Sequence, residues 1–97
     1  MHKEVDALLL AIGELVRLRR IASMDQTELA LRVGLSRSTI SAIERGVGVN
    51  AAALFTVLHF FDLLDDYHAL IDRQLQLTGT QGVRKSRKPQ EELPNDF

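Results

Sequence analysis

The sequence has no cysteine and no tryptophan, and only two prolines and one tyrosine in 97 residues. The absence of cysteine excludes disulfides and thiolate zinc sites, and it fits a protein of the reducing cytosol. The chain also has no long apolar run. Its longest N-terminal run, ALLLAI at residues 7–12, is too short to span a bilayer. Acidic residues precede this run and RLRR follows it, which reverses the charge order of a signal peptide. We therefore expect a cytoplasmic protein that does not enter a membrane.

Residue groups that carry catalysis or bind metals are also scarce. The three histidines, His2, His59 and His68, have no partners at metal-ligand spacing. The aspartates between residues 62 and 72 are not joined by a glycine-containing calcium loop. The serines at 36, 38 and 41 have no neighbouring base, and no glycine-rich loop opens a helix to bind phosphate. The sequence therefore predicts a protein without a metal or cofactor, and not an enzyme.

The segment from residue 25 to residue 46, DQTELALRVGLSRSTISAIERG, is the most informative part of the chain. Asp25 and Glu28 have the spacing of a reciprocal helix cap, and an apolar stripe at helical spacing follows them. Gly34 stands where a helix ends in the left-handed conformation, and Ser36 can cap a second helix. The segment predicts two short helices joined by a tight turn.

The second of these helices has two different faces. At 100° per residue, Ile40 and Ile43 lie on its inner side. Its outer side consists of short polar residues, an alanine and arginines, without an acidic group: Arg37, Ser38, Ser41, Ala42 and Arg45. A helix that enters a DNA major groove needs small side chains, hydrogen-bonding groups and no negative charge. This face therefore predicts a DNA-reading surface.

Residues 12–63 resemble the Cro/repressor helix-turn-helix family, also called XRE, through Q-x-x-L-A, the turn glycine, S-R-S-T-I-S and the E-R-G end. The resemblance implies an all-α, lambda-repressor-like bundle of five helices that binds an operator in double-stranded DNA as a homodimer. The base-reading positions that it implies are Arg37, Ser38, Ser41 and Ala42. It also implies a structural ion pair between Arg19 and Glu44, and a phosphate contact from Gln26. The loop after Gly46 departs from the family pattern, because it reads VGVN and lacks the usual lysine or arginine and proline.

Three further residues of this segment are predicted to contact DNA phosphates: Ser36, Thr39 and Arg45. Arg20 is predicted to do so as well, because it falls off the apolar stripe of the first helix and is available for phosphate or solvent. Residues 17–45 carry a net charge of +3 and residues 50–79 a net charge of −3, although the whole chain has a net charge of −1. This asymmetry indicates one face for phosphate and another turned away from it.

The remaining elements are predicted from apolar spacing. A first helix over residues 5–21 is expected to face the core with Leu8, Ile12, Leu15 and Leu18. A fourth helix follows the cap residue Asn50, and a fifth spans about residues 65–77. We interpret the apolar residues around the fifth helix as a dimer surface, the alternative being that all of them are core. They are Phe60, Leu63, Leu64, Tyr67, Leu70 and Ile71.

These elements predict a DNA-binding and dimerisation domain over residues 1–77. Residues 78–97 are predicted to be a flexible charged tail, used as a phosphate-binding or partner-binding arm or simply solvated. Within the family, residues 54–66 and the basic tail are most similar to small HipB-type antitoxins, which repress their own operon and bind a kinase-like toxin. A restriction–modification controller or a phage-type repressor is the alternative, and an adaptor that binds only protein is a third reading.

Overall fold

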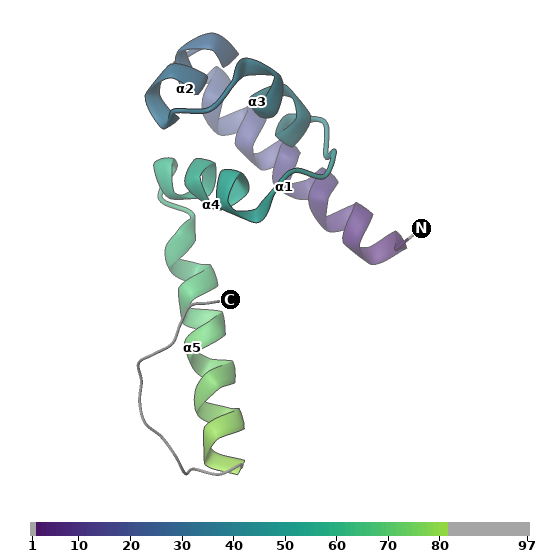
Figure 1. The fold of residues 1–97 in the computed structure, drawn as a ribbon, viewed down its shortest axis with the longest axis vertical. Coiled ribbons are helices and arrows are strands. Elements are labelled where there is room, and N and C mark those ends of the chain that lie inside the picture. The colour runs from purple at the N-terminus through teal and green to yellow at the C-terminus, as the bar shows by residue number, and fades with distance from the viewer. Residues whose placement is uncertain (1, 82–97) are drawn as a thin grey trace. The chain divides into compact units, whose positions relative to one another are not determined.

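A computed structural model describes residues 2–81 of the chain, with side chains as far as residue 79. Over these residues the backbone forms five α-helices and no strand (Figure 1). The helices are α1 (Lys3–Ile21), α2 (Gln26–Val33), α3 (Arg37–Glu44), α4 (Ala51–Phe60) and α5 (Leu64–Gln81). The predicted all-α fold is confirmed, and the helix-turn-helix segment lies where the sequence indicated.

The chain divides into two compact units, residues 1–64 and residues 65–97. The first unit contains α1 to α4, and the described part of the second is α5. Because α5 continues to Gln81, residues 78–81 are helical, and the tail predicted to begin at residue 78 was wrong at this boundary. The rest of the predicted tail, including its RKSRK cluster, lies outside the described residues. Among the helices of the described part, none is long and apolar enough to cross a membrane.

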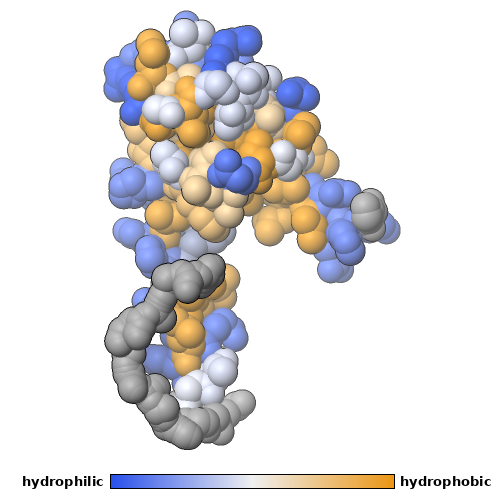
Figure 2. All heavy atoms as spheres, in the orientation of Figure 1, coloured by the Kyte–Doolittle hydropathy of each residue, from blue (hydrophilic) through white to orange (hydrophobic). Residues whose placement is uncertain are grey.

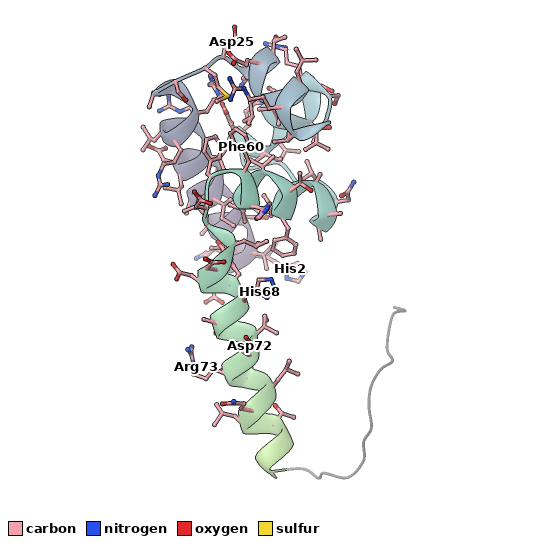
Figure 3. All side chains as sticks on the ribbon, turned by 90° about the vertical axis from the view of Figure 1, so that its left-hand side faces the viewer. His2, Asp25, Phe60, His68, Asp72 and Arg73 are labelled. Atoms are coloured by element: carbon pink, nitrogen blue, oxygen red, sulfur yellow. The ribbon has the colours of Figure 1, made fainter. Side chains whose placement is uncertain are left out.

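Local capping explains where the short helices begin and end. The carboxylate of Asp25 accepts a hydrogen bond from the backbone N–H of Glu28 at 2.8 Å, and the Asn50 side chain accepts one from Ala53 at 2.7 Å. These bonds satisfy backbone donors that the first turn of a helix leaves without partners. The Glu28 carboxylate pairs with Arg32 instead of returning to the cap residue, so only half of the predicted reciprocal cap forms. In Figure 3, Asp25 marks the beginning of α2 and Phe60 the end of α4.

The core of the first unit brings together buried side chains from all four of its helices. They are Ile12, Val16, Leu29, Ala30, Ile40, Ile43, Ala53, Val57 and Leu58. The turn after α4 closes this unit: the N–H of Leu63 donates to the carbonyl of Leu58 at 2.8 Å, and the rings of Phe60 and Phe61 meet edge to face at 5.0 Å. The core therefore contains both isoleucines of α3 and holds that helix from beneath.

The core-facing side of α1 differs from the prediction. Ile12 is buried as expected, but Leu8, Leu15 and Leu18 are 57%, 37% and 49% exposed. The buried side of α1 consists of Ile12, Gly13 and Val16. The reason is the packing of α1 on α3. A Cβ atom on Gly13 would lie only 2.4 Å from the carbonyl oxygen of Ile43, so α1 presents its glycine to the end of α3.

Candidate nucleic-acid interface

The turn between α2 and α3 is fixed by backbone hydrogen bonds. Gly34 has a φ of +74°, a left-handed conformation that glycine adopts without the steric cost of a Cβ. Its N–H and the N–H of Leu35 both donate to the carbonyl of Ala30, at 2.9 and 3.0 Å. These paired bonds end α2 and set the direction in which the chain enters α3.

A cluster of hydroxyl groups lies at the beginning of α3. The Ser36 hydroxyl accepts a hydrogen bond from the backbone N–H of Thr39 at 3.1 Å. It also lies 2.8 Å from the Thr39 hydroxyl and 3.1 Å from the Ser38 hydroxyl. The predicted cap is confirmed, and the cap orders the side chains of the first turn. The phosphate contacts predicted for Ser36 and Thr39 remain predictions.

The two faces of α3 differ as the sequence indicated. Ile40 is fully buried and Ile43 is 3% exposed, so the inner face is anchored in the core. On the outer face, Arg37 and Ser38 are exposed and Ser41 and Ala42 are half-buried.

Arg45 follows directly after α3 and is exposed. Its Nε donates to the Ser41 hydroxyl at 3.3 Å. The four predicted base-reading residues thus lie on α3, and Arg45 lies at its end. Their side is opposite to the buried apolar face of the helix, which packs in the core.

A charged cluster joins α1, α2 and α3 at the end of α3. The carboxylate of Glu44 binds the guanidinium of Arg20 through two hydrogen bonds, 2.5 Å from Nε to Oε2 and 3.0 Å from Nη2 to Oε1. The side chains of Arg20 and Glu44 are only 11% and 4% exposed. Nη1 of Arg20 donates to the carbonyl of Met24 at 3.0 Å, which also ties down the loop before α2. From α1, Arg20 therefore contacts two parts of the helix-turn-helix at once, the loop before α2 and the end of α3.

The predicted partner of Glu44 was wrong by one residue. The ion pair expected from Arg19 is made by Arg20, while Arg19 is exposed and donates to the carbonyl of Phe61 at 3.4 Å. Arg20 lies four residues after Val16 and seven after Gly13, so it shares their inward face, whereas Arg19 lies about 100° away. The phosphate contact predicted for Arg20 remains a prediction: Nε, Nη1 and Nη2 of its guanidinium each already donate one hydrogen bond within the protein, and its side chain is 11% exposed.

Arg20 remains charged inside this cluster. The hydrogen bonds that Arg20 donates to Glu44 raise the pKa of Arg20 above its usual value, against the lowering effect of burial, and the charge of Glu44 raises the pKa further. A permanently charged guanidinium that donates two hydrogen bonds holds a carboxylate in one orientation. The last turn of α3 is therefore held by charge as well as by apolar packing.

Gln26 is the third member of the cluster. Its Nε2 donates to Oε1 of Glu44 at 3.0 Å, and its side chain is half-buried at the start of α2. An amide nitrogen carries two hydrogens, so a second donor remains for a phosphate oxygen. The phosphate contact predicted for Gln26 remains a prediction, and the bond to Glu44 is a role that spacing in the sequence did not indicate.

The chain turns sharply after α3. Gly46 has a φ of +76°, and the N–H of Val47 donates to the carbonyl of Ala42 at 2.9 Å. A Cβ on Gly46 would lie 2.7 Å from Cδ2 of Leu10, so this glycine also gives α1 room beside the turn. Val47 and Gly48, in the loop that lacks the family's basic residue, are exposed.

The sequence reasoning missed Gly13 as a contact between α1 and α3. The signal was present, because a glycine inside a helix weakens it and usually indicates a close approach of another element. Taking Gly13 as the inward point would have placed Val16 and Arg20 on the same face. Among the side chains that the structure describes, no three potential metal ligands come together.

Comparison with known families gives one match. The model of the helix-turn-helix family matches residues 15–65, which is more than half of the 97-residue chain. The chain therefore belongs to the helix-turn-helix family, in its XRE type. Comparison with curated proteins and with solved structures finds no match. The matched region includes α2, α3, α4 and residues 15–21 of α1, and so contains the whole candidate interface.

Proposed function

We propose that this protein is a sequence-specific transcription regulator that places α3 in the DNA major groove. One observation carries the proposal: Ile40, Ile43 and Glu44 fix α3 to the rest of the domain, while Arg37 and Ser38 stay exposed on its outer side. In helix-turn-helix proteins, the residues at the start of the second helix contact base edges. Arginine donates two hydrogen bonds to guanine in the commonest specific contact. The proposal therefore assigns base reading to Arg37, Ser38, Ser41 and Ala42.

The proposed active form is a homodimer that binds two half-sites through two copies of α3. On α5, Leu70 and Ile71 are 42% and 54% exposed. Leu64 and Tyr67, which fall on the same side of this helix, are half-buried. Exposed apolar area of this kind supports a protein interface, and we place the dimer contact there together with Phe60 and Leu63. Two-fold symmetry then sets the half-sites about one helical turn apart.

Selection of bound fragments from a random pool of duplex DNA tests the proposed function. We expect enrichment of a pseudo-palindrome, with an affinity that falls steeply as salt rises, because phosphate binding releases counterions. A protein that only binds other proteins would enrich no sequence and would show no affinity for duplex DNA. That result would exclude the proposed function in favour of the adaptor alternative.

Replacing Arg37 by alanine should weaken binding to the selected operator by about 1–3 kcal/mol and relax the preference at one base pair. We predict a guanine at that position, because Arg37 is exposed on the outer side of α3 and arginine most often contacts guanine when it reads a base. The measurement is a competition assay with operators mutated one base pair at a time. Arg32→Ala is the matched control, since Arg32 is half exposed and pairs with Glu28 on α2. Unchanged base preference in Arg37→Ala would remove this residue from the reading surface.

Replacing Gln26 by alanine should weaken binding to all DNA sequences about equally, which is the signature of a lost phosphate contact. The same assay with the operator and with unrelated duplex DNA measures the two affinities. Because Gln26 also donates to Glu44, thermal unfolding of the variant is measured in parallel, so that a loss of stability is recognised. A loss confined to the operator would contradict the phosphate assignment.

Narrower proposals rest on the resemblance of residues 54–66 to HipB-type antitoxins. Repression follows if the operator overlaps a promoter, and a kinase-like toxin is the partner that this resemblance suggests. A restriction–modification controller or a phage-type repressor is the alternative. The genes next to the coding sequence distinguish these alternatives. A toxin gene is expected beside an antitoxin, a methyltransferase gene beside a restriction–modification controller, and phage genes beside a phage-type repressor.

A further inference from the structure

Helix α1 carries apolar side chains on a second face, away from the core. Leu8, Leu15 and Leu18 are 57%, 37% and 49% exposed, and Ala11 between them is exposed as well. We call Leu8, Ala11, Leu15 and Leu18 the outer stripe of α1. Part of the apolar surface of α1 is visible in Figure 2. Contiguous exposed apolar area on a small domain usually marks a protein interface.

The spacing of the outer stripe is that of a helix that pairs with another helix. Its members follow one another at three and four residues, the pattern of positions a and d in a heptad. From Leu8 to Leu18 the stripe is about 15 Å long, at 1.5 Å per residue. On an ideal helix it lies roughly 130° around from Ile12, Gly13 and Val16, which face the core and α3. A partner on the stripe thus leaves the outer side of α3 free.

Charges near the two ends of the stripe differ in sign. Glu4 lies in line with the stripe towards the beginning of α1, where Lys3 and Asp6 are also found. Arg19 is exposed and borders the stripe towards the end of the helix. An antiparallel copy of the same helix would set the Glu4 end beside the Arg19 end, and it would also pair opposite ends of the helix dipoles. A parallel copy would set like charges together.

We propose that the outer stripe of α1 binds the same stripe of a second copy of this chain, in the antiparallel direction. The heptad positions then set Leu8 opposite the partner's Leu18, and Ala11 opposite the partner's Leu15. Small side chains face large ones in the two central layers, which is how helix surfaces interlock. This contact is separate from the dimer surface proposed on α5, and it does not depend on DNA binding.

The contact is small and therefore weak in dilute solution. A helix pair only about 15 Å long buries less than the roughly 1,200 Å² of a standard stable interface. The Glu14 side chains of the two copies also approach one another near the two-fold axis, which weakens the contact further. Such a surface acts when copies are already held close together. On DNA it would join neighbouring dimers, a consequence that rests on the proposed function.

Disulfide trapping tests the proposal, because the natural chain has no cysteine. Leu8→Cys and Leu18→Cys proteins are prepared separately, mixed at high concentration and oxidised. We expect a covalent dimer in the mixture and none from either protein alone. In the antiparallel pair a residue and its own copy at position 8 or 18 lie about 15 Å apart along the axis, beyond the reach of a disulfide.

Control variants distinguish the proposed contact from other ways in which a dimer could be trapped. An Arg17→Cys protein, exposed on α1 but away from the stripe, should not replace either partner. Dimers from Leu8→Cys alone would indicate a parallel contact and would overturn the proposal. Equal trapping with Arg17→Cys would overturn it as well, and so would the absence of a dimer in the mixture of Leu8→Cys and Leu18→Cys. Trapping of Leu8→Cys by an Ile71→Cys protein, in place of Leu18→Cys, would show that α5 covers the stripe, and would overturn it too.

A second measurement does not use cysteine. Leu8→Glu should raise the dissociation constant of the α1 contact about tenfold or more in sedimentation experiments, because the interface between two copies then contains two carboxylates, one at each contact with Leu18. Leu31→Glu is the matched control, since Leu31 is 79% exposed on α2. Circular dichroism verifies that both variants are folded. Equal self-association of Leu8→Glu and Leu31→Glu would contradict the proposal even if the operator binding is normal.

Discussion

Replacing Glu44 by alanine is expected to lower the free energy of unfolding by about 3 kcal/mol. The Glu44 carboxylate is the shared acceptor for Arg20 and Gln26, and its side chain is only 4% exposed. Without it, the guanidinium of Arg20 remains largely buried without its acidic partner, and that is the costly outcome for a buried pair. In a domain of this size the loss corresponds to a fall of roughly 12–24 °C in the unfolding midpoint. Thermal unfolding followed by circular dichroism measures it.

Glu28→Ala is the control for Glu44→Ala. Glu28 pairs with Arg32 through a contact of 2.6 Å, similar in length to that of Glu44, but the two side chains are 46% and 53% exposed. Exposed ion pairs within one helix contribute only about 0.3–0.5 kcal/mol. Unfolding of Glu44→Ala at the same temperature as Glu28→Ala would show that the cluster does not hold α3. A variant with both Arg20 and Glu44 replaced by methionine should recover part of the loss, because no buried charge is left behind.

The same cluster links stability to the proposed DNA binding. Glu44 is at the end of α3, whereas Arg37 and Ser38 are at its beginning. The residue that anchors the helix and the residues proposed to read bases therefore belong to one helix. A base-reading side chain must be held within a fraction of an ångström to discriminate between base pairs. Glu44→Ala is therefore expected to weaken operator binding even at temperatures where the variant is folded.

The helix-turn-helix could be predicted from the sequence because its signals are local. Asp25, Gly34 and Ser36 each act on backbone groups within a few residues, and the structure shows each of them in the expected conformation. The inner face of α3 was equally clear, since Ile40 and Ile43 are its only large apolar residues. Local chemistry of this kind does not depend on how the helices pack.

The orientation of α1 could not be predicted in the same way. Apolar residues cover more than half of its circumference, so helical periodicity alone does not choose between the Leu8–Leu15 side and the Ile12–Val16 side. The choice depends on a tertiary contact, the approach of Gly13 to the carbonyl groups of α3. The ion pair between Arg19 and Glu44 was implied by the family resemblance, and the same contact explains its correction, because the observed face of α1 brings Arg20 rather than Arg19 towards Glu44.

The fifth helix shows another limit of sequence reasoning. Its existence was predicted, but its end was placed four residues too early, because glycine and threonine at residues 78–80 are poor helix formers. Helix propensity is a weak guide near a helix end, where a few backbone hydrogen bonds decide the outcome. His68, Asp72 and Arg73 project from α5 in Figure 3, and among the described residues none of them belongs to a group of metal ligands. The role that we propose for α5 is the dimer contact.

Replacing Gly13 by alanine is expected to destabilise the domain by about 2–3 kcal/mol, although the same change inside an exposed helix stabilises by about 1 kcal/mol. The new Cβ would lie 2.4 Å from the carbonyl oxygen of Ile43 and 2.7 Å from that of Glu44. Both are backbone atoms of α3, so neither can rotate away as a flexible side chain would. Relief requires α1 and α3 to separate, which loosens the core around Ile12 and Ile43 and stretches the bonds between Arg20 and Glu44.

The sign of the Gly13→Ala effect makes the prediction decisive. Gly79→Ala in α5 is the matched control, because a Cβ there would meet no atom of another element within 4 Å, whereas a Cβ on Gly13 meets the backbone of α3. Thermal unfolding should show a lower midpoint for Gly13→Ala, and an unchanged or higher midpoint for Gly79→Ala. A higher midpoint for Gly13→Ala would mean that α1 does not approach the end of α3 so closely. In that case the bidentate contact from Arg20 would lose its geometric basis, since the same approach brings the guanidinium to Glu44.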